Sequence, residues 1–234
     1  MLVKDAPKNE VSRRRLIQTG LTTAAAALLA GGLDLTFPSA AQAQSTLTPD
    51  QALKELMDGN QRYTSGKMTS FEHDLAILKQ HTEEKQEPFV AVLSCADSRV
   101  PVELVFDQSI GHVFVTRVAG NVLTPELIGS LEYGAAVLGT KVILVMGHSN
   151  CGAVKATMQG KEVPGQISSL FPHIQPAVEQ DGKDLTNTTK INAKIQADLL
   201  RQSSTVIAGM VKSGSVKVLP AYYDVGNGSV TLLQ

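Results

Sequence analysis

The residues of this chain that could do chemistry gather in two short segments, which also hold its only two cysteines. Cys95 follows an apolar run of strand character at residues 88–93. Cys151 comes shortly after a similar run at residues 141–146, with His148 between them. If both runs are strands of an open α/β sheet, these side chains meet at the carboxyl edge, where such sheets bind ligands. Two thiolates and one imidazole suit zinc, and three protein ligands leave one coordination position open, as in catalytic zinc sites.

The same cysteines have a simpler interpretation, either as a disulfide or as two buried apolar thiols. Their neighbours favour a metal. Gly147 and Gly152 permit close approach of the backbone to a site. Asp97 and Arg99 place a carboxylate and a guanidinium two and four residues after the first cysteine, and a structural disulfide needs neither.

Length and composition describe an ordinary globular protein. The chain has 234 residues, a net charge of -1 and a hydrophobic content of 43%, which is enough for one domain with a substantial core. The near-zero net charge provides no basic patch, so nucleic acid is not expected as a partner.

The N-terminal segment has the features of an export signal. Three arginines within residues 12–17 form a twin-arginine pattern, a weakly apolar stretch follows at residues 21–30, and residues 41–43 read Ala-Gln-Ala. We predict a twin-arginine-type signal peptide over residues 1–43, cleaved after Ala43, and a single domain over residues 44–234. A retained membrane anchor is the alternative, but a stretch rich in Ala, Gly and Thr and interrupted by Asp34 would make a poor permanent span. The expected location is periplasmic or otherwise exported, with no stable membrane span after cleavage.

Beyond residue 44 the hydrophobic pattern alternates between strands and helices. This predicts the α/β class, with a mainly parallel central sheet flanked by helices and an N-terminal helical arm. The expected strands are 88–95, 113–115 and 142–146, with a closing hairpin of 216–225 and 229–233. The expected helices are 48–63, 73–80, 101–106, 125–138, 151–158, 166–179 and 184–212.

Residues 95–99 (Cys-Ala-Asp-Ser-Arg) and 148–152 (His-Ser-Asn-Cys-Gly) together resemble the two signatures of the β-class carbonic anhydrases. Residues 111–121, 130–134 and 222–228 are also similar to that family, so the resemblance covers about residues 50 to 234. It implies reversible hydration of carbon dioxide to bicarbonate and a proton by a zinc-bound hydroxide. The expected cofactor is one Zn²⁺ per chain, held by Cys95, His148 and Cys151. The resemblance also implies a homodimer or a dimer of dimers, with the helical arm packing across a partner subunit.

Asp97 and Arg99 are the expected catalytic residues. Asp97 could accept the proton of the zinc-bound water, while a bidentate pair with Arg99 would keep Asp97 ionised and turned away from the metal. Without Arg99, Asp97 could instead become a fourth zinc ligand and close the site, as in some members of the family. The sequence leaves both resting forms open. An ordinary surface ion pair is the third interpretation.

Other site residues are assigned less directly. An apolar pocket for carbon dioxide could be lined by Val100, Phe106, Val122 and Tyr133. The histidines that could carry the proton to solvent are His73, His112 and His173, although for each of them an ordinary surface or capping role is the favoured interpretation.

Two other functions remain open at the level of sequence. The same zinc site could hydrolyse carbon disulfide or carbonyl sulfide, as relatives do. A non-catalytic zinc or thiol-redox protein is the second alternative; its redox form predicts a disulfide between Cys95 and Cys151 and leaves Asp97 and Arg99 without a purpose.

Overall fold

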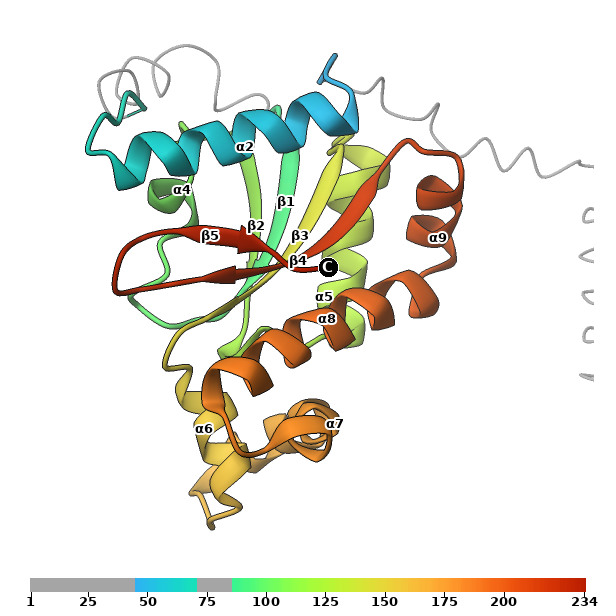
Figure 1. Ribbon diagram of the computed structural model, residues 1–234. Helices are drawn as coiled ribbons and strands as arrows, with labels where there is room; N and C mark the ends of the chain where they lie inside the picture. Colours follow the sequence, from blue (N-terminus) through green and yellow to red (C-terminus); the bar gives the residue numbers. More distant parts are fainter. Residues whose placement is uncertain (1–44, 71–85) are drawn as a thin grey trace, which may run out of the picture. The chain divides into compact units, whose positions relative to one another are not determined.

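The computed structural model describes residues 45–70 and 86–234, which form a five-stranded sheet flanked by helices (Figure 1). The strand order is β2-β1-β3-β4-β5. Strands β2, β1, β3 and β4 run parallel, and β5 pairs antiparallel with β4. The strands are β1 Val90–Ser94, β2 Val113–Arg117, β3 Val142–His148, β4 Lys217–Tyr223 and β5 Val230–Leu232. The predicted fold class is confirmed. The predicted signal peptide, the predicted helix 73–80 and His73 lie outside the described residues.

Strands β1 and β3 form the centre of the sheet and are buried along their whole length. Both are continuous apolar runs, as parallel strands covered on two faces must be. Ser94, the last residue of β1, pairs with Met146, two residues before β3 ends at His148. The two strands therefore deliver residue 95 and residue 148 to the same edge of the sheet.

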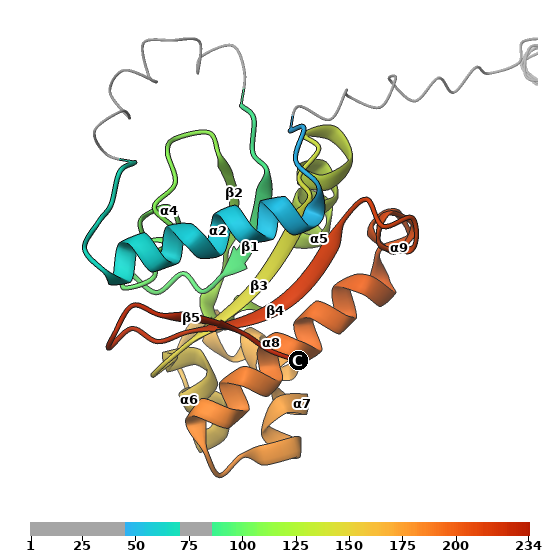
Figure 2. The same ribbon diagram turned by 45° about the horizontal axis from the view of Figure 1, so that its top comes forward.

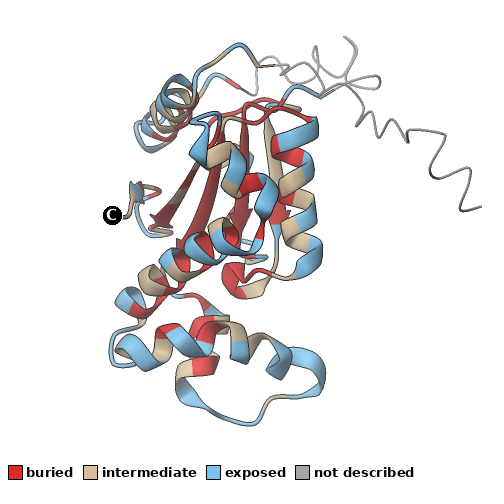
Figure 3. Ribbon diagram, turned by 90° about the vertical axis from the view of Figure 1, so that its right-hand side faces the viewer, coloured by how far each residue is buried: buried red, intermediate tan, exposed pale blue. Residues whose placement is uncertain are grey.

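Successive side chains along these strands enter two different cores. Val90 and Val92 pack with α2 (Pro49–Thr64) and α4 (Val102–Val105), whereas Ala91 and Leu93 pack on the other face. That second face is covered by α5 (Pro125–Glu132), α8 (Leu185–Ser203) and α9 (Thr205–Lys212). Figures 1 and 2 show α2 lying across one face and α8 across the other. Figure 3 shows the burial that results, with buried residues in the strands and on the inner sides of the helices.

Helix α2 is the described part of the expected N-terminal arm. Thr48 caps it through a reciprocal pair with Gln51, and Pro49 occupies the first turn. Its apolar face, with Ala52 and Leu56 fully buried, packs on the sheet of its own chain. The expected arm was to pack across a partner subunit, but its described part, α2, packs on its own domain.

Three helical predictions need correction in detail. The helix expected over residues 184–212 is divided at Ser204, whose extended backbone ends α8 and whose hydroxyl accepts a hydrogen bond from the backbone N–H of Ile207 to start α9. The helix expected over 166–179 is a 3₁₀ segment, Gly165–Leu170, followed by α7, Phe171–Asp181. The helix expected to end at residue 138 passes from α5 into a π-helical turn, Tyr133–Val137. Helix α6 spans Gly152–Gln159, close to its prediction.

No helix within residues 45–70 and 86–234 combines the length and the apolar character that crossing a membrane requires.

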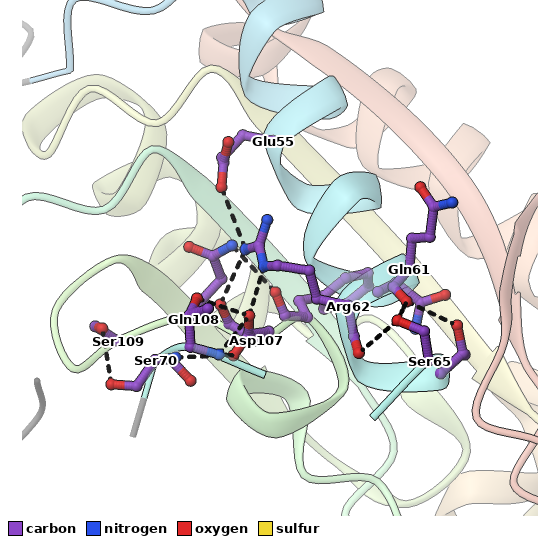
Figure 4. Close-up of polar contacts among 12 residues, drawn as sticks. Glu55, Gln61, Arg62, Ser65, Ser70, Asp107, Gln108 and Ser109 are labelled. Atoms are coloured by element: carbon purple, nitrogen blue, oxygen red, sulfur yellow. Dashed lines mark hydrogen bonds and ion pairs between the residues drawn. The ribbon is translucent and has the colours of Figure 1, made fainter. Parts of the chain in front are cut away.

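A buried carboxylate ties the end of α2 to the segment after α4 (Figure 4). Asp107, whose side chain is fully buried, accepts a hydrogen bond from Arg62 Nε at 2.5 Å. The backbone N–H groups of Thr69 and Ser70 donate to its Oδ1, each at 3.0 Å. Burial alone would raise the pKa of Asp107, but the hydrogen bonds from Arg62, Ser70 and Thr69 outweigh it and lower the pKa to about 2.

This network predicts a specific dependence of stability on pH. Because the pKa of Asp107 falls from an ordinary 3.8 to about 2 on folding, its contribution is complete above pH 4 and disappears as the pH drops towards 2. Asp107→Asn should therefore cost about 2 kcal/mol of unfolding free energy at pH 7 and progressively less below pH 4. Asparagine tolerates the positive φ of 46° at this position, so backbone strain does not confuse the comparison. Urea unfolding at a series of pH values measures the effect.

Asp198→Asn is the matched control, because Asp198 is an exposed carboxylate paired with Arg201. It should change stability by less than about 0.5 kcal/mol at any of these pH values. If the unfolding free energies of the two variants depended on pH in the same way and to the same extent, Asp107 would contribute no more than a surface ion pair.

Candidate metal centre

Cys95, His148 and Cys151 converge at the carboxyl ends of β1 and β3, as their positions in the sequence predict. Their ligand atoms all lie within 4.8 Å of one another, and all three residues are buried. The two Sγ atoms are 4.0 Å apart, and both cysteines are free thiols. We refer to these three residues as the Cys–His–Cys cluster.

Local backbone geometry brings the two ligands of the second segment together. His148 is the last residue of β3, and Cys151 is the N-cap of α6. Between them Asn150 takes a left-handed conformation, with φ 53°, which asparagine adopts more readily than most residues. Ser149 anchors this turn, because its N–H donates to Tyr223 O at 2.9 Å and its Oγ accepts from Val225 N at 2.9 Å.

His148 presents one ring nitrogen to the cluster. Its Nδ1 lies 3.0 Å from the backbone oxygen of Ser149, which can only accept, so Nδ1 carries the proton. Nε2 is then the unprotonated nitrogen, and it is buried without a hydrogen-bond partner. A metal ion would supply that partner, and metal-bound histidines typically donate their other ring N–H to a carbonyl or carboxylate that fixes the tautomer.

The donor set and its spacing fit zinc. Tetrahedral zinc with Zn–S bonds of about 2.3 Å places two thiolate sulfurs about 3.8 Å apart, close to the 4.0 Å found between Cys95 and Cys151. A disulfide requires about 2.05 Å. Among the described residues no further carboxylate, histidine or cysteine belongs to the group, so the protein supplies three ligands.

The thiols differ in how easily they ionise. The pKa of Cys95 is lowered to about 4, mainly because its sulfur accepts a hydrogen bond from Cys151, and the backbone N–H of Gly120 also donates to it at 3.3 Å. The pKa of Cys151 is raised, because it shares its proton with Cys95 and because it is buried. The protein alone thus stabilises one negative charge at this pair. A bound cation is needed before both sulfurs become thiolates.

Asp97 and Arg99 form the bidentate pair that the sequence suggests. Arg99 Nε donates to Asp97 Oδ1 at 2.9 Å, and an Arg99 terminal nitrogen donates to Asp97 Oδ2 at 2.8 Å. These bonds hold the pKa of Asp97 well below its usual range, so the carboxylate stays ionised at neutral pH. Asp97 Oδ2 is 3.9 Å from His148 Nε2. Of the two resting forms left open above, the structure has the one in which Arg99 holds Asp97 beside the cluster.

Arg117, at the end of β2, is a site residue that the motif analysis passed over. Its Nε donates to the carbonyl oxygen of Cys95 at 3.0 Å, and a terminal nitrogen donates to the carbonyl oxygen of Asp97 at 2.6 Å. The sequence did contain a signal for Arg117, because it is a basic residue at the carboxyl end of the strand that neighbours β1. Its two bonds fix the turn that carries Cys95 and Asp97.

The apolar surroundings of the cluster only partly match the expected pocket. Val122 packs with both cysteines, together with Val154 and Ile174. Val100 and Phe106 belong instead to the core beneath α2. Tyr133 is 47% exposed and packs against Phe114, with ring centroids 6.3 Å apart.

Neither described histidine outside the cluster lies beside it as a proton carrier. His112 immediately precedes β2, so it lies at the amino edge of the parallel strands, opposite the cluster, where it contacts Phe89. His173 lies on α7 and lines a cavity against α8. The third candidate, His73, lies outside the described residues.

Comparison with known proteins agrees with this site. A sequence model described as carbonic anhydrase matches residues 90–230. A carbonic anhydrase of Mycolicibacterium smegmatis is 32% identical over 192 residues, covering 79% of this chain and 93% of that protein. Carbonic anhydrase 2 of Mycobacterium tuberculosis is 30% identical over 196 residues, covering 79% of this chain and 92% of that protein.

Solved structures share the fold. A β-carbonic anhydrase of Sordaria macrospora, described as tetrameric, superimposes with a TM-score of 0.62 at 19% identity, over 77% of this chain and 96% of that one. A β-carbonic anhydrase of Aspergillus fumigatus gives a TM-score of 0.63 at 22% identity, over 78% of this chain and 90% of that one. The matched region contains the whole Cys–His–Cys cluster and most of the described sheet, and the chain therefore belongs to the carbonic anhydrase family, in its β class.

Proposed function

We propose that the protein catalyses the reversible hydration of carbon dioxide to bicarbonate and a proton, with a zinc ion held by Cys95, His148 and Cys151. The observation that carries the proposal is the buried Cys–His–Cys cluster in a chain of this family. When bound there, zinc supplies the Lewis acidity that makes water a nucleophile near neutral pH.

The residues around the cluster have separable roles in this reaction. Asp97 is ionised and lies beside the cluster, so its Oδ2 can accept a hydrogen bond from the attacking water and orient it. Arg99 keeps that carboxylate in place. Val122, Val154 and Ile174 form an apolar wall next to the thiols, which suits an apolar substrate and keeps bulk water away.

Zinc content and activity should depend together on the ligands. The wild-type protein is expected to bind about one zinc per chain, because it offers one three-ligand site. Cys151→Ser should lose most of the zinc, and carbon dioxide hydration should fall to the uncatalysed rate. Elemental analysis and stopped-flow hydration assays measure both quantities. Ser203→Ala, an exposed change on α8, should alter neither. Full activity in zinc-free wild-type protein would contradict the proposal.

Removing Arg99 tests the proposed role of the pair. In Arg99→Leu the Asp97 carboxylate loses its two side-chain hydrogen bonds and is free to turn towards the metal, so we expect zinc to be retained. Hydration activity should drop on the order of 100-fold, the usual scale for losing one preorganised electrostatic contact. Lys155→Leu removes an exposed cation from α6 and should have little effect.

Arg99→Leu could lose activity because Asp97 binds the metal, or only because Asp97 is no longer held in position. The double variant Asp97→Ala/Arg99→Leu separates these two causes. If Asp97 closes the site, the cobalt-substituted double variant should regain the spectrum of the wild-type cobalt protein, although not its activity. A spectrum that is unchanged in Arg99→Leu itself would mean that Asp97 does not move to the metal.

We also propose a homodimer or a dimer of dimers. The related Sordaria macrospora enzyme is described as tetrameric. In this chain β2 is an edge strand, and the π-helical turn beside it exposes Tyr133 and Val137 at 47% and 41%. Within the described residues, an edge strand next to exposed apolar side chains favours association with a second copy. Sedimentation of the purified protein as a monomer at micromolar concentration would contradict this proposal.

The proposed location is the periplasm, reached through the twin-arginine-type signal of residues 1–43. The support is the sequence alone: the arginines of residues 12–17, the weakly apolar stretch and the Ala-Gln-Ala of residues 41–43. Intact mass of the exported protein decides whether it begins at Gln44.

A further inference from the structure

Helix α8 buries an unusual row of polar side chains. Thr188, Thr189, Asn192 and Gln196 are all at most 1% exposed, although each carries hydrogen-bonding groups. Burying such groups is costly unless they are bonded. The two threonine hydroxyls donate to backbone carbonyls within or next to α8, namely Asp181, Asp184 and Leu185. The side-chain amides of Asn192 and Gln196 form hydrogen bonds with other segments of the chain.

Asn192 and Gln196 hold the turn that follows β2. Asn192 Nδ2 donates to Gly120 O at 2.9 Å, and Gln196 Oε1 accepts from Leu123 N at 2.9 Å. Gln196 Nε2 donates to His173 O at 3.0 Å and to Asn192 Oδ1 at 3.3 Å. Every one of these partners fixes the orientation of an amide, since carbonyls only accept and N–H groups only donate. The two side chains therefore hydrogen bond to both ends of residues 120–123.

Gly120 is the residue of this turn whose backbone donates a hydrogen bond to the metal cluster. Its N–H donates to Cys95 Sγ at 3.3 Å, while its carbonyl is the group held by Asn192. With φ 78° it takes a conformation that suits glycine. A Cβ at this position would lie 2.8 Å from Ile174 Cδ1 and 3.2 Å from Ala153 Cβ, so no larger residue could stiffen the turn.

Gly120 has no Cβ to restrict its backbone torsions, so the orientations of the two peptide groups that flank it depend on the hydrogen bonds of the turn. The peptide group that follows Gly120 is held at both of its polar atoms, because Gly120 O accepts from Asn192 and the N–H of Asn121 donates to Val118 O at 3.0 Å. Asn192 supplies the side-chain bond of this pair and ties the turn to α8. A hydrogen bond to a thiolate reduces the charge that the sulfur donates to a metal, and such second-shell contacts tune metal sites.

From this chain of contacts we infer that Asn192 is a positioning residue of the metal centre. Acting through Gly120, it sets the strength of the N–H···S bond to Cys95 and so tunes both the donor strength of that thiolate and the retention of the metal. The inference rests on the proposed function, in that it requires Cys95 to be a metal ligand.

The experiment compares cobalt-substituted wild-type protein with Asn192→Ala. The absorption band that arises from charge transfer between thiolate and cobalt should move to longer wavelength in the variant, because a sulfur with a weaker hydrogen bond is a stronger donor. Zinc transfer to a chelator should nevertheless become at least about tenfold faster, because the turn that positions Cys95 is held less firmly and the ligand can leave the metal more easily. Neither readout depends on turnover.

Thr188→Val is the matched control. It removes a buried hydroxyl from the same helix, and that hydroxyl bonds Asp181 O and Asp184 O rather than the turn at Gly120. It should lower the melting temperature to a similar extent and leave the cobalt spectrum and the zinc transfer rate unchanged. If the cobalt spectrum and the zinc transfer rate changed equally in both variants, Asn192 would act only through the general stability of the fold, and the inference would be overturned.

Asn192→Ser keeps the experiment decisive if Asn192→Ala does not fold. Its hydroxyl keeps a hydrogen-bond donor on a shorter side chain, further from Gly120 O, so its spectrum and transfer rate should lie between those of the wild type and the alanine variant, or depart measurably from the wild type if it is compared alone. A folded variant at position 192 with wild-type spectrum and transfer rate would overturn the inference. Wild-type protein that shows no thiolate-to-cobalt band would instead contradict the proposed metal site itself.

Discussion

Two buried sulfur atoms 4.0 Å apart are the constraint on which the rest of the site depends. As thiolates they would carry two negative charges in a place with little access to water, and such charges need compensation. The protein provides only part of it. The N–H of Gly120 points at Cys95, and the backbone N–H groups of Ala153 and Val154, in the first turn of α6, act on Cys151. These partial charges are sufficient for one thiolate, and a divalent cation completes the balance for two.

The polar groups that surround this centre are arranged mainly to hold backbone in place. Arg117 binds the carbonyls of Cys95 and Asp97, Ser149 anchors the turn between His148 and Cys151, and Asn192 binds the carbonyl of Gly120. On the opposite face of the sheet Asn60 does the same, because its amide donates to Val105 O and Gly228 O and accepts from Val230 N. A buried amide can satisfy loop groups that no strand or helix partner reaches. Each face of the sheet thus has one asparagine that fixes the loops beside it.

Sequence patterns predicted the parts of this molecule whose signals are local. The apolar runs at β1 and β3 identified the central strands, and the residue types at their ends identified the cluster, because parallel strands must end at one edge. Val100 and Phe106 were candidates for the substrate pocket because they are apolar, yet the chain turns after Cys95 and packs them under α2. Asn192 and Gln196 were not recognised, since a buried amide and an exposed one look alike in a helical hydrophobicity pattern. The break at Ser204 was missed because residues on both sides of it keep helical periodicity, and only the bonds of its hydroxyl show why the chain bends.

The pairing of Asp97 with Arg99 couples the two ligand segments as well as fixing one carboxylate. Arg99 also donates to the carbonyl oxygen of Asn150, at 3.3 Å, in the turn between His148 and Cys151. Its guanidinium therefore bridges the segment that carries the first thiol and the segment that carries the second. The side chain is 48% exposed, so solvent weakens its bonds more than those of the buried network behind it. The carboxylate of Asp97 is thus held by an exposed side chain, whereas the sulfur of Cys95 also has a buried contact with the N–H of Gly120. A change at Arg99 would therefore act on the turn between His148 and Cys151 as well as on the Asp97 carboxylate.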